Sequence, residues 1–411
     1  MLVLLALPLP LFILWKCLDQ YVLSPRYSFA DPRPFGGQVI INPYDDVNLD
    51  SVAIANFHAH TKIWNGLTNG KGQPQDLYRR YDSLGHDFHA VSQYHHIDTF
   101  GQHAGNYVPA YEHGYNLKKT HQLVIGGSEV VWKDYIFPQS IHNKQDILYR
   151  LAKDTGNIVV INHPAIRNGY TMSDLKKLHY YDYIELLNPS AQSLQHWDTI
   201  LSAGKKVFAM GNDDIHNIFN DKAIGRFITM IYGTNNDASG LYPMLRKGAA
   251  AAVWLPQEEK ESLIQKRNRI ENIKKVVSRI SVKNDSVQII LNYPVAKISL
   301  ITSNGVLKAS DTLTSKMRVP LFPAETYWRF EILLQDRTRI FLNPLYRQTD
   351  YQQLARNEAG RMNVSKNKGN PTMALFLGVF IMVLGSSGLK FKKRTRRHKN
   401  DTWMGYPTLS R

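Results

Sequence analysis

Two histidines one residue apart, directly after an apolar run, constrain this chain more than any other feature. The apolar residues 52–55 are followed by Asn56 and Phe57, and His58 and His60 come next. In an extended strand, side chains at i and i+2 point to the same side, so both imidazoles face one point in space. For a single isolated pair of this kind, two surface histidines on an edge strand would be the better explanation. Five later segments also run from apolar residues into polar groups, and this repetition favours a metal site.

The segment between about residues 52 and 248 alternates strand-like runs with helix-like ones. The strand-like runs are 52–57, 88–92, 122–125, 157–161, 183–187, 205–210 and 226–232. Strands that alternate with helices imply parallel βα units, and about seven units suggest a closed or nearly closed barrel. The chemistry of such barrels lies at the carboxyl ends of the strands. We therefore expect the polar residues that end these runs to meet at one end of an α/β barrel.

The motifs at these strand ends resemble the PHP (polymerase and histidinol phosphatase) superfamily of metal-dependent phosphoesterases. The similarity runs from about Asn56 to Tyr346 and consists of His58-x-His60, Gly127-Ser128-Glu129, His163-Pro164 and Asp214-x-His216. It implies a distorted (β/α)₇ TIM-like barrel with one to three divalent metal ions. By this resemblance, the first metal site would contain His58, His60, Glu129 and Asp214. His163 would join Glu129 at a second site, and His216 would serve a third.

The chain also departs from the family pattern. Asn56 stands where the family usually has Asp, and the second strand ends in Ser-Gln-Tyr-His, which replaces Asp by Gln93 and moves the histidine to His95. The histidine expected after the Glu element is missing, with His142 as a substitute. The first site is thus complete, the second lacks a ligand and the third is altered. The amidohydrolase superfamily also begins with H-x-H, but its bridging lysine and lone final Asp fit this chain less well than Glu129 and the Asp-x-His ending.

These residues predict metal-dependent hydrolysis of a phosphoester. The ligands are N and O donors, which suit Zn²⁺, Mn²⁺ or Fe without choosing among them. His216, His95 or His96 would protonate the leaving group, and Arg167 would hold the phosphate. The substrate would be a phosphorylated small molecule or an envelope polymer. The alternative is a non-catalytic metal-binding scaffold or binding protein derived from a PHP domain.

Composition shifts divide the chain into successive segments. They are an N-terminal anchor or uncleaved signal (1–23), the barrel (50–256), an amphipathic helix (257–280), a small β domain (281–346), a linker (347–371), a transmembrane helix (372–389) and a basic tail (390–411). The amphipathic stripe is expected to pack on the domain, although a membrane or a partner is an alternative. The β domain is expected to be an appendage that follows the barrel.

Charge and cysteine content narrow the choice of partners and compartment. The formal net charge is +16, but seven of the positive charges lie between residues 390 and 399. Basic residues just after an apolar stretch predict a cytoplasmic tail and a membrane-anchored main domain on the extracytoplasmic side. The single cysteine, Cys17, excludes an internal disulfide. Nucleic acid is disfavoured, because the sequence does not indicate one defined surface on which basic residues are interleaved with aromatic ones.

Overall fold

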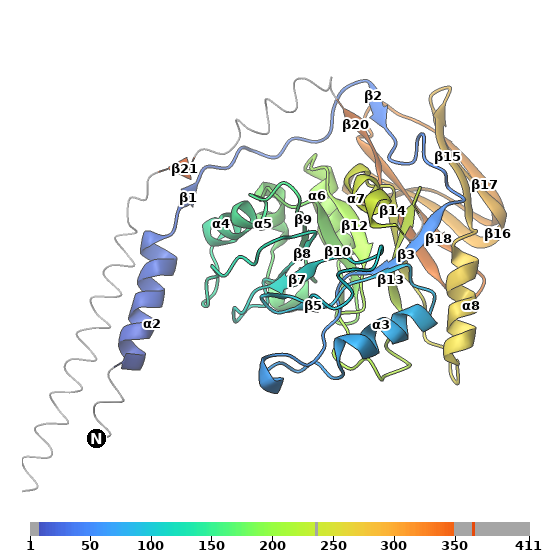
Figure 1. Ribbon diagram of the computed structural model, residues 1–411. Coiled ribbons are helices and arrows are strands. Elements are labelled where there is room, and N and C mark those ends of the chain that lie inside the picture. Colours follow the sequence, from blue (N-terminus) through green and yellow to red (C-terminus); the bar gives the residue numbers. More distant parts are fainter. Residues whose placement is uncertain (1–7, 235–236, 349–363, 366–411) are drawn as a thin grey trace, which may run out of the picture. The chain divides into compact units, whose positions relative to one another are not determined.

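The computed structural model describes residues 8–234, 237–348 and 364–365 (Figure 1). The chain divides into two compact units, one from Tyr27 to Val364 and the other made of Met1–Arg26 and Ser365–Arg411. The smaller unit contains helix α2 (Pro8–Leu18), which continues as a π-helix (η1, Asp19–Leu23). Short strands β1 (Arg26–Tyr27) and β21 (Val364–Ser365) lie where the two units join along the chain.

The predicted membrane-anchored location is corrected by the helices of the structure. Within the described ranges, no helix has both the length and the apolar character that a bilayer crossing requires. Helix α2 has 11 residues, or about 16 Å at 1.5 Å per residue, whereas the hydrocarbon core is about 30 Å thick. The segment 372–389 and the basic tail 390–411 lie outside the described residues.

The first sheet of the larger unit has six strands. It consists of β7 (Ala110–His113), β8 (Gln122–Ile125), β9 (Ile158–Ile161), β10 (Tyr183–Asn188), β11 (Ala191–Gln192) and β12 (Phe208–Gly211). β10 pairs in parallel with β9 on one side and with β12 on the other. β8, however, pairs antiparallel with both β7 and β9. The sheet is therefore mixed rather than purely parallel.

The second sheet has eleven strands and carries the rest of the unit. They are β2 (Val39–Ile41), β3 (Val52–Asn56), β4 (Phe88–His89), β13 (Phe227–Tyr232), β14 (Ala250–Trp254), β15 (Val277–Lys283), β16 (Ser286–Thr302), β17 (Val306–Pro320), β18 (Tyr327–Leu333), β19 (Arg339–Leu342) and β20 (Leu345–Gln348). Only β3 and β4 pair in parallel. β14 pairs antiparallel with β19, so the C-terminal strands continue the sheet that contains β3. A separate pair, β5 (Ser92–Gln93) and β6 (His96–Ile97), is antiparallel.

The predicted fold class, a (β/α)₇ TIM-like barrel of PHP type followed by an appendage and a transmembrane helix, is wrong. In the described ranges no strand of the six-stranded sheet pairs with a strand of the eleven-stranded sheet, so the barrel does not close. The antiparallel pairs are the physical reason, because a TIM barrel closes through parallel neighbours all round. Among the described residues, isolated bridges join Ala59 to Ile215, Lys71 to Asn217 and Tyr94 to Glu112, and the first of them links the segments that follow β3 and β12.

Side-chain amides and a hydroxyl make up for part of the missing backbone ladder. The Asn212 side-chain oxygen, after β12, accepts the N–H of Phe57, after β3, at 2.8 Å, whereas Asn56 of β3 donates to the Phe227 carbonyl of β13 at 3.0 Å within the eleven-stranded sheet. The Thr229 hydroxyl donates to the Gly211 carbonyl at 2.9 Å. Buried backbone groups must find partners, so these side chains stabilise the place where the two sheets meet.

Strand β3 is buried on both faces. Its side chains alternate between two hydrophobic cores: Ala53 and Ala55 face the core that includes the six-stranded sheet, whereas Val52 and Ile54 face the core that includes the C-terminal strands. β13 and β14 alternate in the same way, which makes them an inner layer with apolar material on both sides. A strand buried on both faces reads as a continuous apolar run, as residues 52–55 do.

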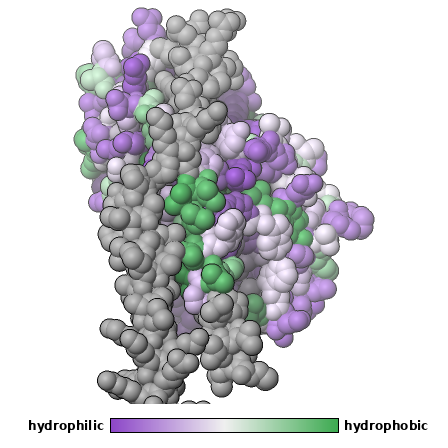
Figure 2. Space-filling view, turned by 90° about the vertical axis from the view of Figure 1, so that its left-hand side faces the viewer, coloured by the Kyte–Doolittle hydropathy of each residue, from purple (hydrophilic) through white to green (hydrophobic). Residues whose placement is uncertain are grey.

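The helices surround these layers, with α4, α5 and α6 (green) beside the six-stranded sheet and α8 (yellow) beside the C-terminal strands (Figure 1). Their bounds are α3 (Pro74–Ser83), α4 (Ile141–Leu151), α5 (Met172–Lys177), α6 (Leu194–Ser202), α7 (Ala238–Lys247) and α8 (Leu263–Ile273), with single turns η2 (Trp64–Gly66), η3 (Ile166–Asn168) and η4 (Ser303–Gly305). Ile270 and Ile273 of α8 are buried in the second core. The coloured surface in Figure 2 is mostly hydrophilic, and hydrophobic side chains (green) appear near the centre of the view and in smaller areas elsewhere.

Candidate metal centre

The segment that leaves β3 carries His58 and His60 into the interior. Their residues are 0% and 1% exposed, and their Nε2 atoms lie 3.2 Å apart. The His60 N–H donates to the Ile215 carbonyl at 2.8 Å, which fixes this segment beside the one that follows β12. The two imidazoles therefore face a common point from a fixed backbone, at the end of the strand.

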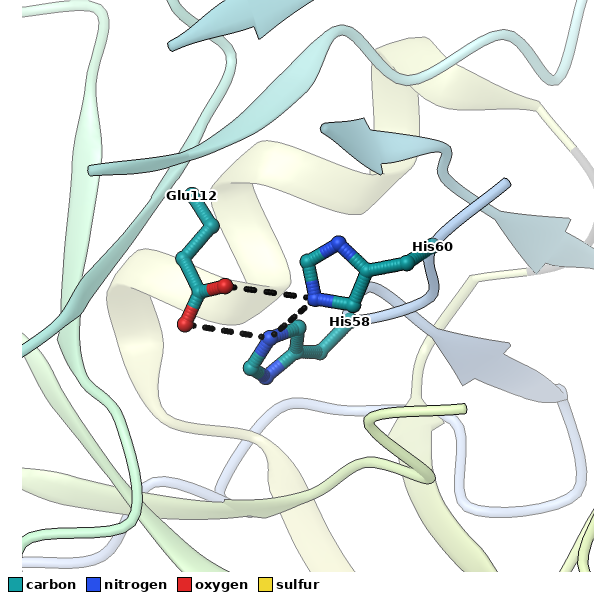
Figure 3. A group of neighbouring side chains, drawn as sticks. All are labelled: His58, His60 and Glu112. Carbon is teal, nitrogen blue, oxygen red and sulfur yellow. Dashed lines mark hydrogen bonds and ion pairs between the residues drawn. The ribbon is translucent and has the colours of Figure 1, made fainter. Parts of the chain in front are cut away.

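Glu112 of β7 reaches the same point from the other sheet (Figure 3). One carboxylate oxygen lies 3.3 Å from His58 Nε2, and the other lies 3.2 Å from His60 Nε2. The same side chain is 2.8 Å from His121 Nδ1 and 3.6 Å from His163 Nε2. One fully buried carboxylate is thus shared by four imidazoles.

Asp214 and His216 approach from the segment after β12. The Asp214 carboxylate lies 3.2 Å from His58 Nε2 and 3.4 Å from His60 Nε2. His216 Nδ1 donates to the Asp214 carbonyl at 2.9 Å, and the His216 ring lies 4.4 Å from the His60 ring between centroids. The His216 side chain, 28% exposed, is the most open member of the cluster.

Three overlapping groups of ligands result. They are His58/His60/Glu112, His60/Asp214/His216 and Glu112/His121/His163, and within each group the ligand atoms lie within 4.8 Å of one another. His60 and Glu112 each belong to two groups, so the groups form one continuous centre. Imidazole and carboxylate donors of this kind suit Zn²⁺, Mn²⁺ and Fe.

The spacing of the donor atoms fits a metal ion. A tetrahedral site with ligands at about 2.1 Å places neighbouring donor atoms about 3.4 Å apart. The Nε2 atoms of His58 and His60 lie 3.2 Å apart and 3.2 and 3.4 Å from one Asp214 oxygen, and each also lies 3.3 or 3.2 Å from one of the two Glu112 oxygens. One Glu112 carboxylate oxygen is also buried without a hydrogen-bond partner. These donors are arranged as the ligands of a divalent cation.

Electrostatics favour a cation at this point. Burial opposes protonation of His58, yet Asp214, Glu112 and Glu185 outweigh it and raise the pKa of the imidazole well above its ordinary value. Burial likewise disfavours the charged form of Glu112, but His121 and His58 hold its pKa well below the usual range. The pKa of Asp214 is lowered in the same way, against burial, with His58 as the largest favourable neighbour. Carboxylates that stay ionised in a buried site attract positive charge.

A second layer of contacts orients the ligands. Glu185 of β10 accepts from His58 Nδ1 at 2.9 Å, so Nε2 is the His58 nitrogen that faces the centre. The same carboxylate accepts the His163 N–H at 3.1 Å and the Asn188 amide at 2.9 Å. Asn188 also donates to Asp214 at 3.2 Å. Histidine ligands in metal sites are characteristically held by such partners.

The structure brings together most of the ligands expected from the sequence, but not Glu129. His58, His60, His163, Asp214 and His216 all belong to the centre. Glu129 follows β8 in an exposed bend and lies outside all three groups. The physical reason is the β7–β8 hairpin, whose register turns Glu112 of β7 inward and leaves the residues after β8 at the surface.

The three other residues expected to act on substrate lie outside the ligand groups. His95 is tied to the backbone at both nitrogens: Nε2 accepts the Gly114 N–H at 3.1 Å and Nδ1 donates to the Val131 carbonyl at 3.2 Å. Burial lowers the pKa of His95 to about 4, so the ring is neutral and structural. His96 is exposed on β6, and Arg167 is exposed and donates to the Leu117 carbonyl at 3.1 Å.

Sequence reasoning missed Glu112 and His121 as ligands and did not assign Glu185 its orienting role. The signal for Glu112 was present in residues 110–113, which run from apolar side chains into a glutamate as the other strand ends do. His121 directly precedes β8, and the hairpin places it beside Glu112. The Glu-to-His pairing expected from the resemblance therefore exists, at Glu112 and His121 rather than at Glu129 and His142.

Comparison with known proteins gave few matches. No protein-family model and no curated protein matches the chain. Two solved structures are similar. A two-domain protein from Bacteroides vulgatus, described as containing a predicted PHP-like metal-dependent phosphoesterase, is 15% identical and matches over 78% of this chain and 93% of its own, with a TM-score of 0.40. PsfC from Pseudomonas syringae is 14% identical over 54% of this chain and 97% of its own, with a TM-score of 0.35. Both TM-scores are below 0.5, so the geometry of the centre carries the functional argument.

Proposed function

We propose that this chain is a metal-dependent phosphoesterase that hydrolyses a phosphate ester with water. The observation that carries the proposal is the buried group of His58, His60 and Glu112, joined through shared ligands to the groups His60/Asp214/His216 and Glu112/His121/His163. Adjacent sites of this composition suit phosphoryl transfer, in which charge on both the attacking and the leaving oxygen must be neutralised.

Divalent ions, when bound, supply Lewis acidity that acidifies water and neutralises charge on phosphoryl oxygens. The protein residues hold the arrangement. Glu112 spans two ligand groups and fixes their separation, because its carboxylate contacts His58, His60, His121 and His163. A rigid, buried set of ligands does not need to reorganise during the reaction.

His216 is the residue best placed to handle a proton. Its Nδ1 donates to the Asp214 carbonyl, which leaves Nε2 available on the most open member of the centre. Burial and the neighbouring His60 lower the pKa of His216, so the ring is neutral, and when it is not itself a ligand its Nε2 can accept a proton from the attacking water. His95 does not compete for this role, since both of its nitrogens contact backbone groups.

The test is turnover by the full chain after reconstitution with Zn²⁺, Mn²⁺ or Fe²⁺. Phosphomonoesters, phosphodiesters and a phosphorylated polymer make up the substrate panel, and phosphate release is measured. Glu112→Gln and His163→Ala should abolish turnover, because each removes a ligand from the centre. Glu129→Gln is the matched control, since this glutamate is exposed and should leave the rate unchanged.

Two outcomes would count against the proposal. Metal-loaded protein that is inert across the whole panel would favour a non-catalytic metal-binding protein. Turnover that survives Glu112→Gln and His163→Ala would place the reaction somewhere other than this centre. Elemental analysis of every variant separates loss of metal from loss of a catalytic step.

A further inference from the structure

Two exposed tryptophans lie beside the metal centre and are not used by the proposed mechanism. Trp64 is 46% exposed and Trp132 is 60% exposed, and their ring centroids are 6.2 Å apart. Tryptophan is a large apolar residue, so two neighbouring rings that are this exposed form an apolar surface open to solvent. An exposed apolar surface next to a reaction centre is a candidate binding site for part of the substrate.

Both rings are connected to the centre through one intervening residue. Trp64 Nε1 donates to the Tyr94 carbonyl at 3.2 Å, and the Tyr94 ring stacks on the ligand His60 with centroids 4.7 Å apart and an angle of 18°. Trp132 stacks on His95 at 5.5 Å and 18°. The His95 N–H in turn donates to the Glu112 carbonyl at 2.9 Å. The tryptophans are therefore held at a fixed position close to the ligands.

The backbone at Trp64 supports a specific role for this ring. Its φ is 53°, in the left-handed region that bulky residues rarely adopt. A conformation of this kind costs free energy and is found where the surrounding contacts determine it, often at functional sites. Here the side chain of Trp64 donates a hydrogen bond to the Tyr94 carbonyl and approaches both Trp132 and His96 edge-on.

We propose that Trp64 and Trp132 form a stacking platform for a ring in the leaving group of the substrate, so that the preferred substrates are organic phosphates that carry a sugar or a base. This inference rests on the proposed phosphoesterase function. One face of Trp132 covers His95, and the high exposure of the side chain leaves its other face to solvent. The two indoles meet at 68°, so they form a corner rather than a parallel clamp.

A ring with an apolar face fits this corner. The faces of aromatic rings carry partial negative charge, and they attract the polarised C–H groups of a sugar as well as the flat surface of a base. A phosphate attached to such a ring would extend from the platform toward His60 and Asp214. Glycerol phosphate has no ring and would gain nothing from the platform, which makes it the reference substrate.

The experiment compares kcat/KM for glucose 1-phosphate, ribose 5-phosphate, adenosine monophosphate and glycerol phosphate in the reconstituted full chain. In Trp132→Ala, the ratio of kcat/KM for a ringed substrate to that for glycerol phosphate should fall about tenfold, as expected for loss of one stacked ring. Trp132→Phe retains a ring and should restore most of the ratio. A selective loss for the two sugar phosphates assigns the platform to sugars, and a loss confined to the nucleotide assigns it to bases.

Trp15→Ala is the matched control, because Trp15 is also exposed (56%) but lies in helix α2 of the other unit. It should keep the wild-type ratio. A ratio that is unchanged in both Trp132→Ala and Trp64→Ala overturns the platform while leaving the phosphoesterase function intact.

A separate binding measurement covers the case in which the wild type hydrolyses nothing. Calorimetric titration with methyl glucoside and with adenosine, neither of which carries a phosphate, reports ring binding without turnover. Binding to the wild type that Trp132→Ala loses supports the platform even though the proposed function has failed. Absence of binding to the wild type overturns it.

Discussion

Replacing Glu112 by glutamine removes one negative charge from the point where two of the three ligand groups meet. Glu112 contacts four imidazoles between 2.8 and 3.6 Å, so no other carboxylate of the centre is shared so widely. Loss of a partner outside the ligand shell already lowers metal affinity by about 10–100-fold. For Glu112, a shared ligand, we expect a loss of about 100-fold or more, or about 2.8 kcal/mol at 1.4 kcal/mol per decade.

Variants of two other glutamates, Glu185 and Glu129, provide reference points for the size of the expected loss of metal affinity. Glu185 orients His58 from outside the ligand groups, so Glu185→Gln should weaken metal binding by about tenfold. Glu129 is exposed and should show no change when replaced. The expected order of loss is therefore Glu112, then Glu185, then Glu129. The assay is competition for Zn²⁺ against a fluorescent chelator, with bound metal counted by elemental analysis. Equal affinities for the Glu112 and Glu129 variants would refute the assignment of the centre.

Three predictions concern stability. Arg329 is buried and donates twice to Asp198 at 2.8 Å, so Arg329→Met should lower the free energy of unfolding by about 3–5 kcal/mol in urea, and adding Asp198→Asn should recover part of it. Burial lowers the pKa of His89 from 6.5 to about 4, so the folded state holds this histidine in its neutral form. The unfolded chain takes up the proton first as the pH falls, and the free energy of unfolding therefore decreases by about 3 kcal/mol between pH 6.5 and pH 4. His89→Phe should flatten that loss in pH-dependent urea unfolding, and an unchanged slope would contradict it. Gly248 has φ 82° and a Cβ there would collide with the Phe208 ring, so Gly248→Ala should cost about 1–3 kcal/mol and lower Tm in calorimetry.

Local sequence patterns located most of the strands of the expected barrel, although not β7, because a buried strand needs a continuous or alternating apolar run. The run expected at 122–125 coincides with β8, and those expected at 157–161 and 226–232 differ by one residue from β9 and β13. Strand direction was not predictable in this way. Whether a neighbour runs parallel or antiparallel depends on pairing between distant segments, and the antiparallel pairs of β8 changed a barrel into two sheets.

The ligands of the metal centre were predictable where neighbouring residues of one segment determine the direction of the side chains. His58 and His60 belong to one extended segment, so their common direction follows from the two-residue period alone. Glu112 depends on a hairpin, in which the register rather than the local sequence decides which side chain turns inward. A glutamate near the expected place, Glu129, fitted the motif equally well on sequence and ended at the surface.

The pairing of β2 with β20 has a consequence for the order in which the chain can fold. Val39–Ile41 pairs with residues 346–348, which follow about 300 residues later. At a synthesis rate of about 5–20 residues per second, about 15–60 s separate the emergence of the two strands from the ribosome. In the last part of that interval, after β14 has emerged, β14 also lacks one of its neighbours, β19. Every ligand of the metal centre has emerged by residue 216, long before β19 and β20. During synthesis the centre can therefore assemble on a sheet whose later strands do not yet exist. Open strand edges of this kind are where incorrect pairing begins.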